Sequence, residues 1–259
     1  DAALPFHQHN VGVLAESDDK FTVASGTAGI GLGGAGIGVS FTVNDITSTT
    51  KAYIDGANVT GLAKGAGDEL TVYSGGLTGD GVDLGKQVDL DTYNSLDLKS
   101  LKATETLAGV AINASSSEHI ENISANVAGG SSLAIGVVEA IDAIGGSTQA
   151  YALNASVNRN NTGANARQRL AITSSNIAFD NAFVGGISVS TGGGAGGAAL
   201  DTHGIARSTF AYARHSDIAS LGNTRVKAQS VQGISSVGVG GSAGTFAFAG
   251  TLSLALFDN

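Results

Sequence analysis

The chain has 259 residues, of which 39 are glycine and one is proline, and it contains no cysteine, methionine or tryptophan. Only 14% of its residues are charged while 42% are hydrophobic, which excludes a disordered tail because such tails are rich in charge and poor in apolar residues. The net charge of −9 argues against a nucleic-acid partner, since the chain repels a phosphate backbone. The lack of cysteine excludes disulfides and thiolate metal sites. No apolar run approaches the ~20 residues of a membrane helix, so we expect no membrane insertion.

The first predicted elements are strands. A short strand-like opener at 11–15 precedes a glycine- and alanine-rich stretch at 28–43, where large apolar residues such as Val39, Phe41 and Val43 alternate with small or polar ones. This period of two is typical of a β-strand. A segment of the form Ile-x-x-x-Thr-x-Ala-Tyr follows and ends at Tyr53.

Residues 61–97 interrupt this pattern with an acidic insertion, which we expect to be a loop or hairpin projecting from the rest of the fold. It contains a strand-like stretch at 70–73. Its carboxylates indicate either a solvated loop or a Ca²⁺ site, because hard cations bind several carboxylate oxygens. The candidate calcium ligands are Asp80, Asp83, Asp89 and Asp91.

The same order of elements then repeats. A second opener is predicted at 98–103, and the stretch 133–144 has a composition that would suit a helix, but its register with the first copy predicts a strand. The Thr-x-Ala-Tyr segment recurs and ends at Tyr151, and a polar turn is predicted at 159–167.

A third copy has its opener at 170–173 and its Thr-x-Ala-Tyr segment ending at Tyr212. A fourth begins near Arg225, with an opener at 226–228 and an alternating apolar stretch at 246–256. The sequence stops about where the next Thr-x-Ala-Tyr segment should follow. We therefore expect either a fragment of a longer array or a subunit whose missing strand comes from a neighbour.

Three of the five tyrosines occupy one slot of the repeat, and this self-similarity predicts an all-β, repetitive β-solenoid, specifically a parallel β-helix. The predicted regions of this one continuous domain are 1–60, 61–97, 98–158, 168–219 and 225–259. The structural repeat positions are Thr50, Thr148, Thr209, Tyr53, Tyr151 and Tyr212. The tyrosines are expected either to seal the corners of the stack or to offer stacking platforms for a glycan.

Other motifs carry little chemistry. The G-x-G-x-x-G match at 29–34 has no following helix to bind a pyrophosphate, and the G-x-S-x-G match at 240–244 has no later histidine to complete a hydrolase triad. Three histidines scattered along the later part of the chain are expected at the surface or in turns: His119, His203 and His215.

The segment 37–46, followed by Thr49-Thr-Lys-Ala-Tyr-Ile54, resembles the repeats of large filamentous adhesins of Gram-negative bacteria, of the secreted haemagglutinin and leukotoxin-like group. The resemblance covers most of the chain, and the insertion at 61–97 matches least well. It implies export to the cell surface or the medium, a long β-helical rod and surface attachment. It supplies no catalytic residues.

These observations favour a non-catalytic, structural and adhesive segment of an extracellular bacterial surface filament, with no cofactor unless calcium binds. The expected partners are neighbouring repeats or copies, end to end, and a glycan or protein on a host or bacterial surface, contacted by the insertion and the polar turns. One alternative is a self-assembling subunit of a filament or surface layer, since open strand edges recruit further strands. A polysaccharide-cleaving β-helix enzyme is less favoured, because it needs clustered acids and aromatic subsites that the repeat does not place.

Overall fold

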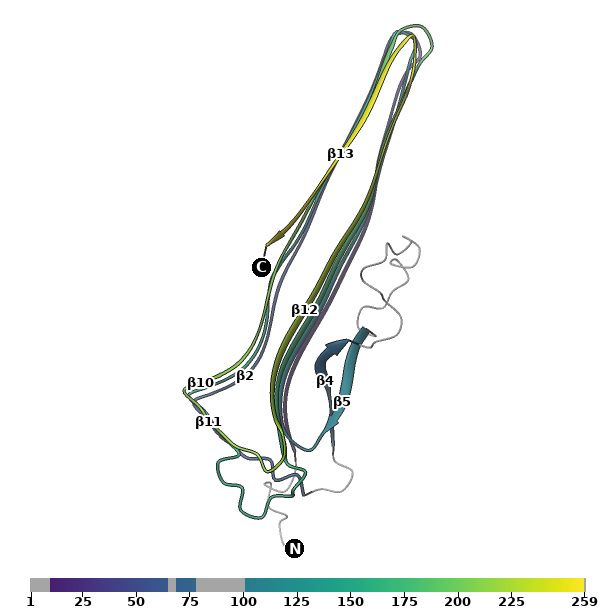
Figure 1. The fold of residues 1–259 in the computed structure, drawn as a ribbon. Helices are drawn as coiled ribbons and strands as arrows, with labels where there is room; N and C mark the ends of the chain where they lie inside the picture. Colours follow the sequence, from purple (N-terminus) through teal and green to yellow (C-terminus); the bar gives the residue numbers. More distant parts are fainter. Residues whose placement is uncertain (1–9, 65–68, 78–100, 259) are drawn as a thin grey trace, which may run out of the picture.

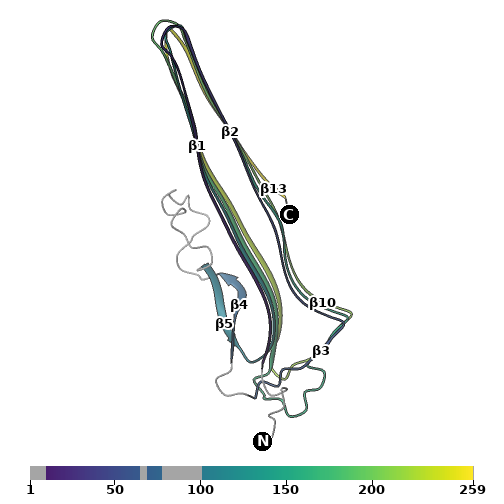
Figure 2. The same cartoon turned by 180° about the vertical axis from the view of Figure 1, so that it is seen from behind.

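The computed structural model describes residues 10–64, 69–77 and 101–258, and it is dominated by two long parallel sheets that face each other along a narrow rod (Figures 1 and 2). Sheet A contains, in spatial order, β1 (Val11–Gly31), β6 (Gly109–Gly130), β9 (Arg169–Ser190) and β12 (Thr224–Ala243). Sheet B contains β2 (Ala35–Asp55), β7 (Leu133–Leu153), β10 (Gly194–Arg214) and β13 (Phe246–Asp258). A small third sheet, C, contains β3 (Asn58–Val59), β8 (Ser156–Val157) and β11 (Asp217–Ile218).

Each turn of the chain forms one rung of this rod. A strand of sheet A runs to the tip, a tight turn reverses the chain, and a strand of sheet B runs back toward the short strands of sheet C (Figure 1). The longest strands have 21 or 22 residues, which corresponds to about 70 Å of extended chain. Rungs pair with parallel strands only, so the predicted all-β, solenoid-like architecture of stacked parallel strands is confirmed.

The repeat register predicted from the sequence is also the register of the sheets. Ile37 of β2 pairs with Ile135 of β7, and Ile144 of β7 pairs with Ile205 of β10. The stretch 133–144, helix-like in composition, forms the first half of β7. The alternation of large and small residues therefore outweighs helix propensity here, because the side chains of a strand must match those of the rungs on either side.

One predicted opener is wrong. The strand in register with β1 is β6, whose Val110 pairs with Val11, and not the segment at 98–103. Lys102 instead begins β5 (Lys102–Leu107), which pairs antiparallel with β4 (Leu70–Leu77) outside the rungs. Because the insertion adds residues to this rung, paired residues of β1 and β6 are 99 apart in the sequence, whereas those of β6 and β9 are 60 apart. The openers predicted at 170–173 and 226–228 do lie in β9 and β12.

The described part of the insertion packs against the rod. Val72 of β4 is buried in a cluster with Leu107, Ala111 and Ala171, and the latter two lie on the outer face of sheet A. The backbone carbonyl of Tyr73 accepts hydrogen bonds from Asn113 Nδ2 at 2.8 Å and from Thr173 Oγ1 at 3.0 Å. The hairpin of β4 and β5 therefore covers the outside of sheet A near its lower end, as Figure 1 shows, and explains why β6 and β9 are buried there on both faces.

The space between sheets A and B is filled by apolar and polar layers in alternation. Nearest sheet C, an apolar cluster contains Ile54, Ile112 and Leu170. A second apolar cluster, with Ile120, Ile144 and Ile205, lies further along the rod, and a third contains Val138 and Val184. Charged side chains that belong to none of these three clusters lie along the strands between them. This interior differs from a single apolar core, and it contains the charged groups described next.

Candidate functional site

The three repeat tyrosines form a ladder on the outer face of sheet B. Tyr53, Tyr151 and Tyr212 pair in register, with ring centroids 5.1 Å and 5.0 Å apart and ring planes within 8° and 1° of parallel. The rings cover one another's faces, so a sugar could stack only on the two outermost faces of the ladder. This geometry favours the interpretation that the tyrosines hold neighbouring rungs together.

The repeat threonines form an inward column beside that ladder. Thr148 Oγ1 lies 2.6 Å from Ser116 Oγ of the facing sheet and accepts a hydrogen bond from Arg207 Nη2 at 3.0 Å. Thr50 is also buried. Thr209, on the next rung, has a buried Oγ1 with no hydrogen-bond partner among the described residues. The column therefore connects the two sheets at Thr148, whereas the residue of β9 in register with Ser116 is Asn176, whose amide donates to Ser116 and Glu118.

The predicted calcium ligands lie outside the described residues. These are Asp80, Asp83, Asp89 and Asp91. Their arrangement stays a prediction.

A buried ion pair crosses the rod between the first two apolar clusters. Arg207 Nη2 lies 2.8 Å from Glu118 Oε1, and both side chains have no solvent exposure. The guanidinium also donates to the carbonyls of Ser48 and Gly145, and Asn176 Nδ2 donates to the other oxygen of Glu118 at 2.6 Å. Burial raises the pKa of Glu118, and the positive charge of Arg207 opposes that rise. The pair needs both members, because an unpaired buried charge is costly.

A second buried cluster surrounds His203. Its Nε2 lies 2.6 Å from Asp201 Oδ2 and its Nδ1 lies 2.8 Å from Asp180 Oδ2. Burial lowers the pKa of His203, but the hydrogen bonds and negative charges of Asp180 and Asp201 outweigh it and raise the pKa to about 10. His203 is therefore an imidazolium that donates both of its N–H groups to carboxylates.

Asp142 adds a third carboxylate to this cluster. Burial and the charge of Asp180 raise the pKa of Asp142 from 3.8 to about 6, although Asn44 and Asn122 each donate a hydrogen bond to it. Asp142, Asp201 and His203 carry ligand atoms within 4.8 Å of one another, which is a spacing that could hold a metal ion. The nitrogen–oxygen separations of 2.6 and 2.8 Å fit a shared proton better, because two ligands at ~2.0–2.1 Å from one tetrahedral zinc lie further apart.

Two of the three histidines that were expected at the surface or in turns are buried. His203 and His119 are buried, at 0% and 3% exposure, and are not surface or turn residues; His215 is exposed and lies at a turn with φ of 50°. Counting the alternation of the repeat places His203 in the inward column of Asn44 and Asp142, and that count could have found it. The residues on the facing sheet could not be found this way, because the repeat does not show which inward columns oppose each other.

The outer face of sheet B is apolar from the tip to about half its length. Among the outward positions of 35–43, 133–143, 194–204 and 246–256, only Glu139 is charged. Large apolar side chains there are 38% to 79% exposed: Ile37, Val39, Phe41, Val43, Leu133, Leu200, Phe246, Phe248, Leu252, Leu254 and Leu256. This surface, which we call the apolar face of sheet B, is larger than the apolar patches that monomeric proteins usually expose.

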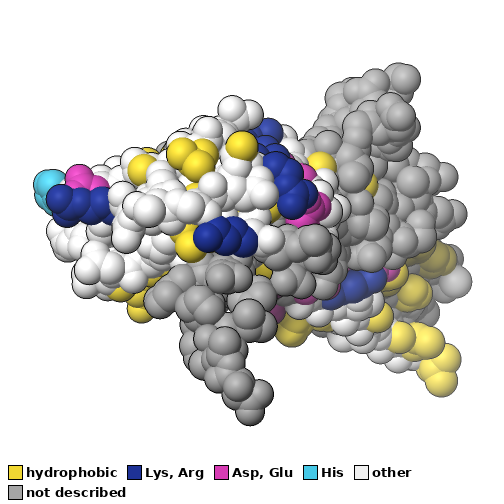
Figure 3. All heavy atoms as spheres, turned by 90° about the horizontal axis from the view of Figure 1, so that it is seen from below, with side chains coloured by type: hydrophobic (Ala, Val, Ile, Leu, Met, Phe, Trp, Pro, Cys, Tyr) yellow, Lys and Arg dark blue, Asp and Glu magenta, His cyan; other side chains and the backbone are white. Residues whose placement is uncertain are grey.

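Charged surface residues gather at the opposite end of the rod. Seen from below, that end shows lysine, arginine and acidic side chains among neutral ones (Figure 3). Arg167 lies 3.0 Å from Glu69, and Arg159 lies 3.5 Å from Asp217. Exposed pairs of this kind add little stability, so their main effect is to keep this end hydrated.

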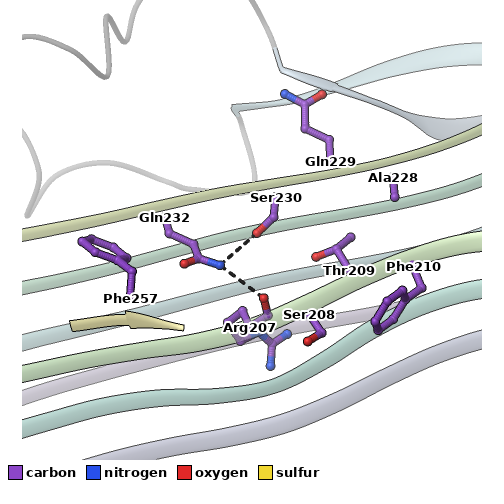
Figure 4. A pocket seen from close by; sticks show the side chains of 9 residues that line it. All are labelled: Arg207, Ser208, Thr209, Phe210, Ala228, Gln229, Ser230, Gln232 and Phe257. Carbon is purple, nitrogen blue, oxygen red and sulfur yellow. Dashed lines mark hydrogen bonds between the residues drawn. The ribbon is translucent and has the colours of Figure 1, made fainter. Parts of the chain in front are cut away.

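A groove opens at the edge formed by rung four. Its volume is about 550 Å³, and its walls come from Arg207 to Phe210 of β10, from β12 between Ala228 and Gln232, and from Phe257 of β13 (Figure 4). Gln232 Nε2 donates to the Arg207 carbonyl at 3.3 Å and so spans the groove. Within the described residues, β13 pairs with β10 from Gly194 to Ala206, and the groove lies beyond that paired stretch.

No protein-family model, no curated protein and no solved structure matches this chain. Across the described ranges, no helix is long and apolar enough to cross a membrane. Conclusions about function therefore depend on the geometry of the chain itself.

Proposed function

We propose that this chain is a non-catalytic, structural segment of an extracellular bacterial surface filament, of the filamentous adhesin kind. The observation that carries the proposal is the register of the rungs, in which residues at the same position of the repeat pair with one another from rung to rung. Identical side chains lie above one another in Ile46, Ile144 and Ile205 and in the tyrosine ladder. Each rung stabilises the next, so the same rule can extend a rod indefinitely.

The titratable clusters support a structural role. Asp180, Asp201 and His203 are exposed by no more than 2%, so a substrate has no route to them. The Glu118–Arg207 pair is equally enclosed. Groups of this kind contribute to the specificity of folding, and a polysaccharide-cleaving site would need them at a surface cleft.

The adhesive part of the proposal is assigned to the insertion and the polar turns, which lie outside the regular rungs. It is tested by coating fluorescent beads with the protein and measuring their retention on bacterial or host cells and on a glycan array. The matched variant replaces residues 79–99 with a short turn, which keeps β4, β5 and the buried Val72. We expect retention to fall to the level of uncoated beads. Equal retention by the variant would remove the insertion from the adhesive role.

A second candidate function is a self-assembling subunit, and the apolar face of sheet B favours it. Its exposed side chains amount to about 1,000 Å² of apolar surface, and a stable interface needs about 800 Å² per partner. Two such faces could pack as a sandwich with the sheets ~10 Å apart.

Negative-stain electron microscopy over a range of concentrations separates the two candidates. Isolated short rods at every concentration favour the filament segment, and long or laterally paired filaments that grow with concentration favour the assembling subunit. The variant Val39→Lys, Leu254→Lys adds charge to the apolar face, and it should abolish lateral pairing. Compact particles without a long axis would contradict both proposals.

A further inference from the structure

The tyrosine ladder holds three phenol rings against one another in positions that the backbone sets. Tyr53, Tyr151 and Tyr212 pair in register on neighbouring parallel strands. The ring centroids are 5.1 Å and 5.0 Å apart and the planes are within 8° of parallel, so the rings follow the ~4.8 Å spacing of the strands. Each ring carbon of Tyr151 therefore lies beside the equivalent carbon of the ring on either side.

The ladder is also open to solvent along its outer side. Tyr53 is 50% exposed, and Tyr151 and Tyr212 are half-buried. A soluble oxidant can therefore reach the ring edges and hydroxyls, although the ring faces of Tyr151 are covered. The open side leaves the rings room to tilt toward one another.

The composition of the chain directs an oxidant to its tyrosines. Thiols and thioethers are ordinarily the first side chains to be oxidised. This chain contains no cysteine, no methionine and no tryptophan, but it has five tyrosines. Three of those five lie in the ladder, so the ladder is the place where two oxidised rings would most often be neighbours.

We propose that the tyrosine ladder is a site of oxidative modification, at which a one-electron oxidant of the peroxidase class joins the ring of Tyr151 to that of Tyr53 or Tyr212 by a carbon–carbon bond. Two phenols each give one electron to the oxidant and one proton to water. The two phenoxyl radicals couple at one Cε carbon of each ring. Those two carbons then lose their hydrogens as protons, and the phenolic oxygens regain a proton each. The net loss of two electrons and two protons reduces one hydrogen peroxide to two waters.

The parallel pairing makes this coupling selective. Strands on both sides of Tyr151 keep its two partners adjacent for as long as a radical lasts. The partners are therefore present at an effective concentration far above that of a second chain in dilute solution. The bond would join positions 98 apart in the sequence between β2 and β7, or 61 apart between β7 and β10, and so would link neighbouring rungs covalently. The proposal does not rest on the adhesive role or on filament formation.

The probe is a haem peroxidase with hydrogen peroxide, added to folded protein at a dilution where sedimentation shows single particles. Dityrosine fluorescence measures the yield, and denaturing electrophoresis shows whether the link lies within one chain. Mass spectrometry of proteolytic peptides locates it through the loss of two hydrogen atoms. We expect single chains in which links between neighbouring ladder rings are at least about tenfold more abundant than any other pair.

The variant Tyr151→Phe isolates the role of the stack, because phenylalanine keeps an aromatic ring in the ladder but cannot form a phenoxyl radical. Tyr53 and Tyr212 are then two rungs apart, and the yield of dityrosine should fall at least about tenfold. The matched control is Tyr73→Phe. Tyr73 lies in the hairpin on the outside of sheet A, where its hydroxyl donates to Glu16 at 2.8 Å, and its replacement should leave the yield unchanged.

Three results would overturn the proposal: no dityrosine in the unmodified chain, an undiminished yield in Tyr151→Phe, or linked peptides that come mainly from Tyr73, from Tyr93 or from two separate chains. None of these depends on whether the chain forms filaments or attaches to cells, so this site and the proposed function fail separately.

Discussion

Raising the pH above neutrality should destabilise the protein through His203. The imidazole has a pKa of about 10 in the folded chain and an ordinary value of 6.5 when unfolded. The folded state therefore keeps a proton that the unfolded state loses. Its stabilising effect is complete below pH 6.5 and disappears as the pH rises through about 10.

The size of this effect follows from the shift. Each unit of pKa corresponds to about 1.4 kcal/mol, so the free energy of unfolding should fall by about 1.4 kcal/mol per pH unit between pH 7 and 9.5. The whole contribution is at most about 5 kcal/mol. Full burial of the histidine and of its partners Asp180 and Asp201 means that solvent screening does not reduce it.

Urea unfolding monitored by circular dichroism at half-unit steps of pH measures this slope. His203→Gln should remove it. His119→Gln is the matched control, because burial lowers the pKa of His119 and its contribution changes only below pH 6.5. A free energy of unfolding that stays constant between pH 7 and 9.5 in the unmodified chain would refute the protonated-histidine interpretation, whether or not the variants fold.

Three further changes test the packing, each by urea unfolding. Glu118→Gln leaves the buried guanidinium of Arg207 without its carboxylate and should cost about 3–5 kcal/mol, and adding Arg207→Met should recover part of that loss; no recovery would mean that the cost is not one of unpaired charge. Gly146→Ala should cost at least about 2 kcal/mol, because φ is 111° and a Cβ would lie 1.9 Å from a backbone oxygen, whereas Gly204→Ala meets open space and should change stability by about 0.5 kcal/mol or less. Tyr151→Ala loses two ring contacts at about 0.5–1.5 kcal/mol each, so truncating a terminal ring of the ladder should cost about half as much.

The fold could be predicted because residues that pair between neighbouring rungs occupy equivalent positions of the sequence repeat. Tyr53, Tyr151 and Tyr212 recur at one slot because they stack on one another, and the alternation around Ile37 and Ile135 follows the pleat of each strand. The second opener could not be placed in this way, because the segment at 98–103 mixes apolar and polar residues as the other openers do, and only the pairing of Lys102 with β4 shows that it leads into the hairpin.

The buried charges could not be predicted in the same way. Glu118 and Arg207 lie on different sheets and different rungs, and the repeat specifies neighbours along a sheet but not partners across the rod. Arg207 departs from its own column, where β7 has Gly146, whereas Glu118 lies between Asp19 of β1 and Ala178 of β9. A residue that breaks its column is thus where a cross-rod contact should be sought.

These exceptions suggest why a repetitive rod would keep charge inside. A strand that slips by two residues along its neighbour preserves the inward and outward pattern, and small residues such as alanine would tolerate it. The same slip of β10 would separate Arg207 from Glu118 and His203 from Asp180, while Asp201, on the same strand, would move with the histidine. Leaving one such charge buried and unpaired costs about 3–5 kcal/mol, so two clusters on different layers would make any slipped rung unfavourable. The polar layers would therefore fix the register that the apolar layers permit, and that register aligns the tyrosine ladder.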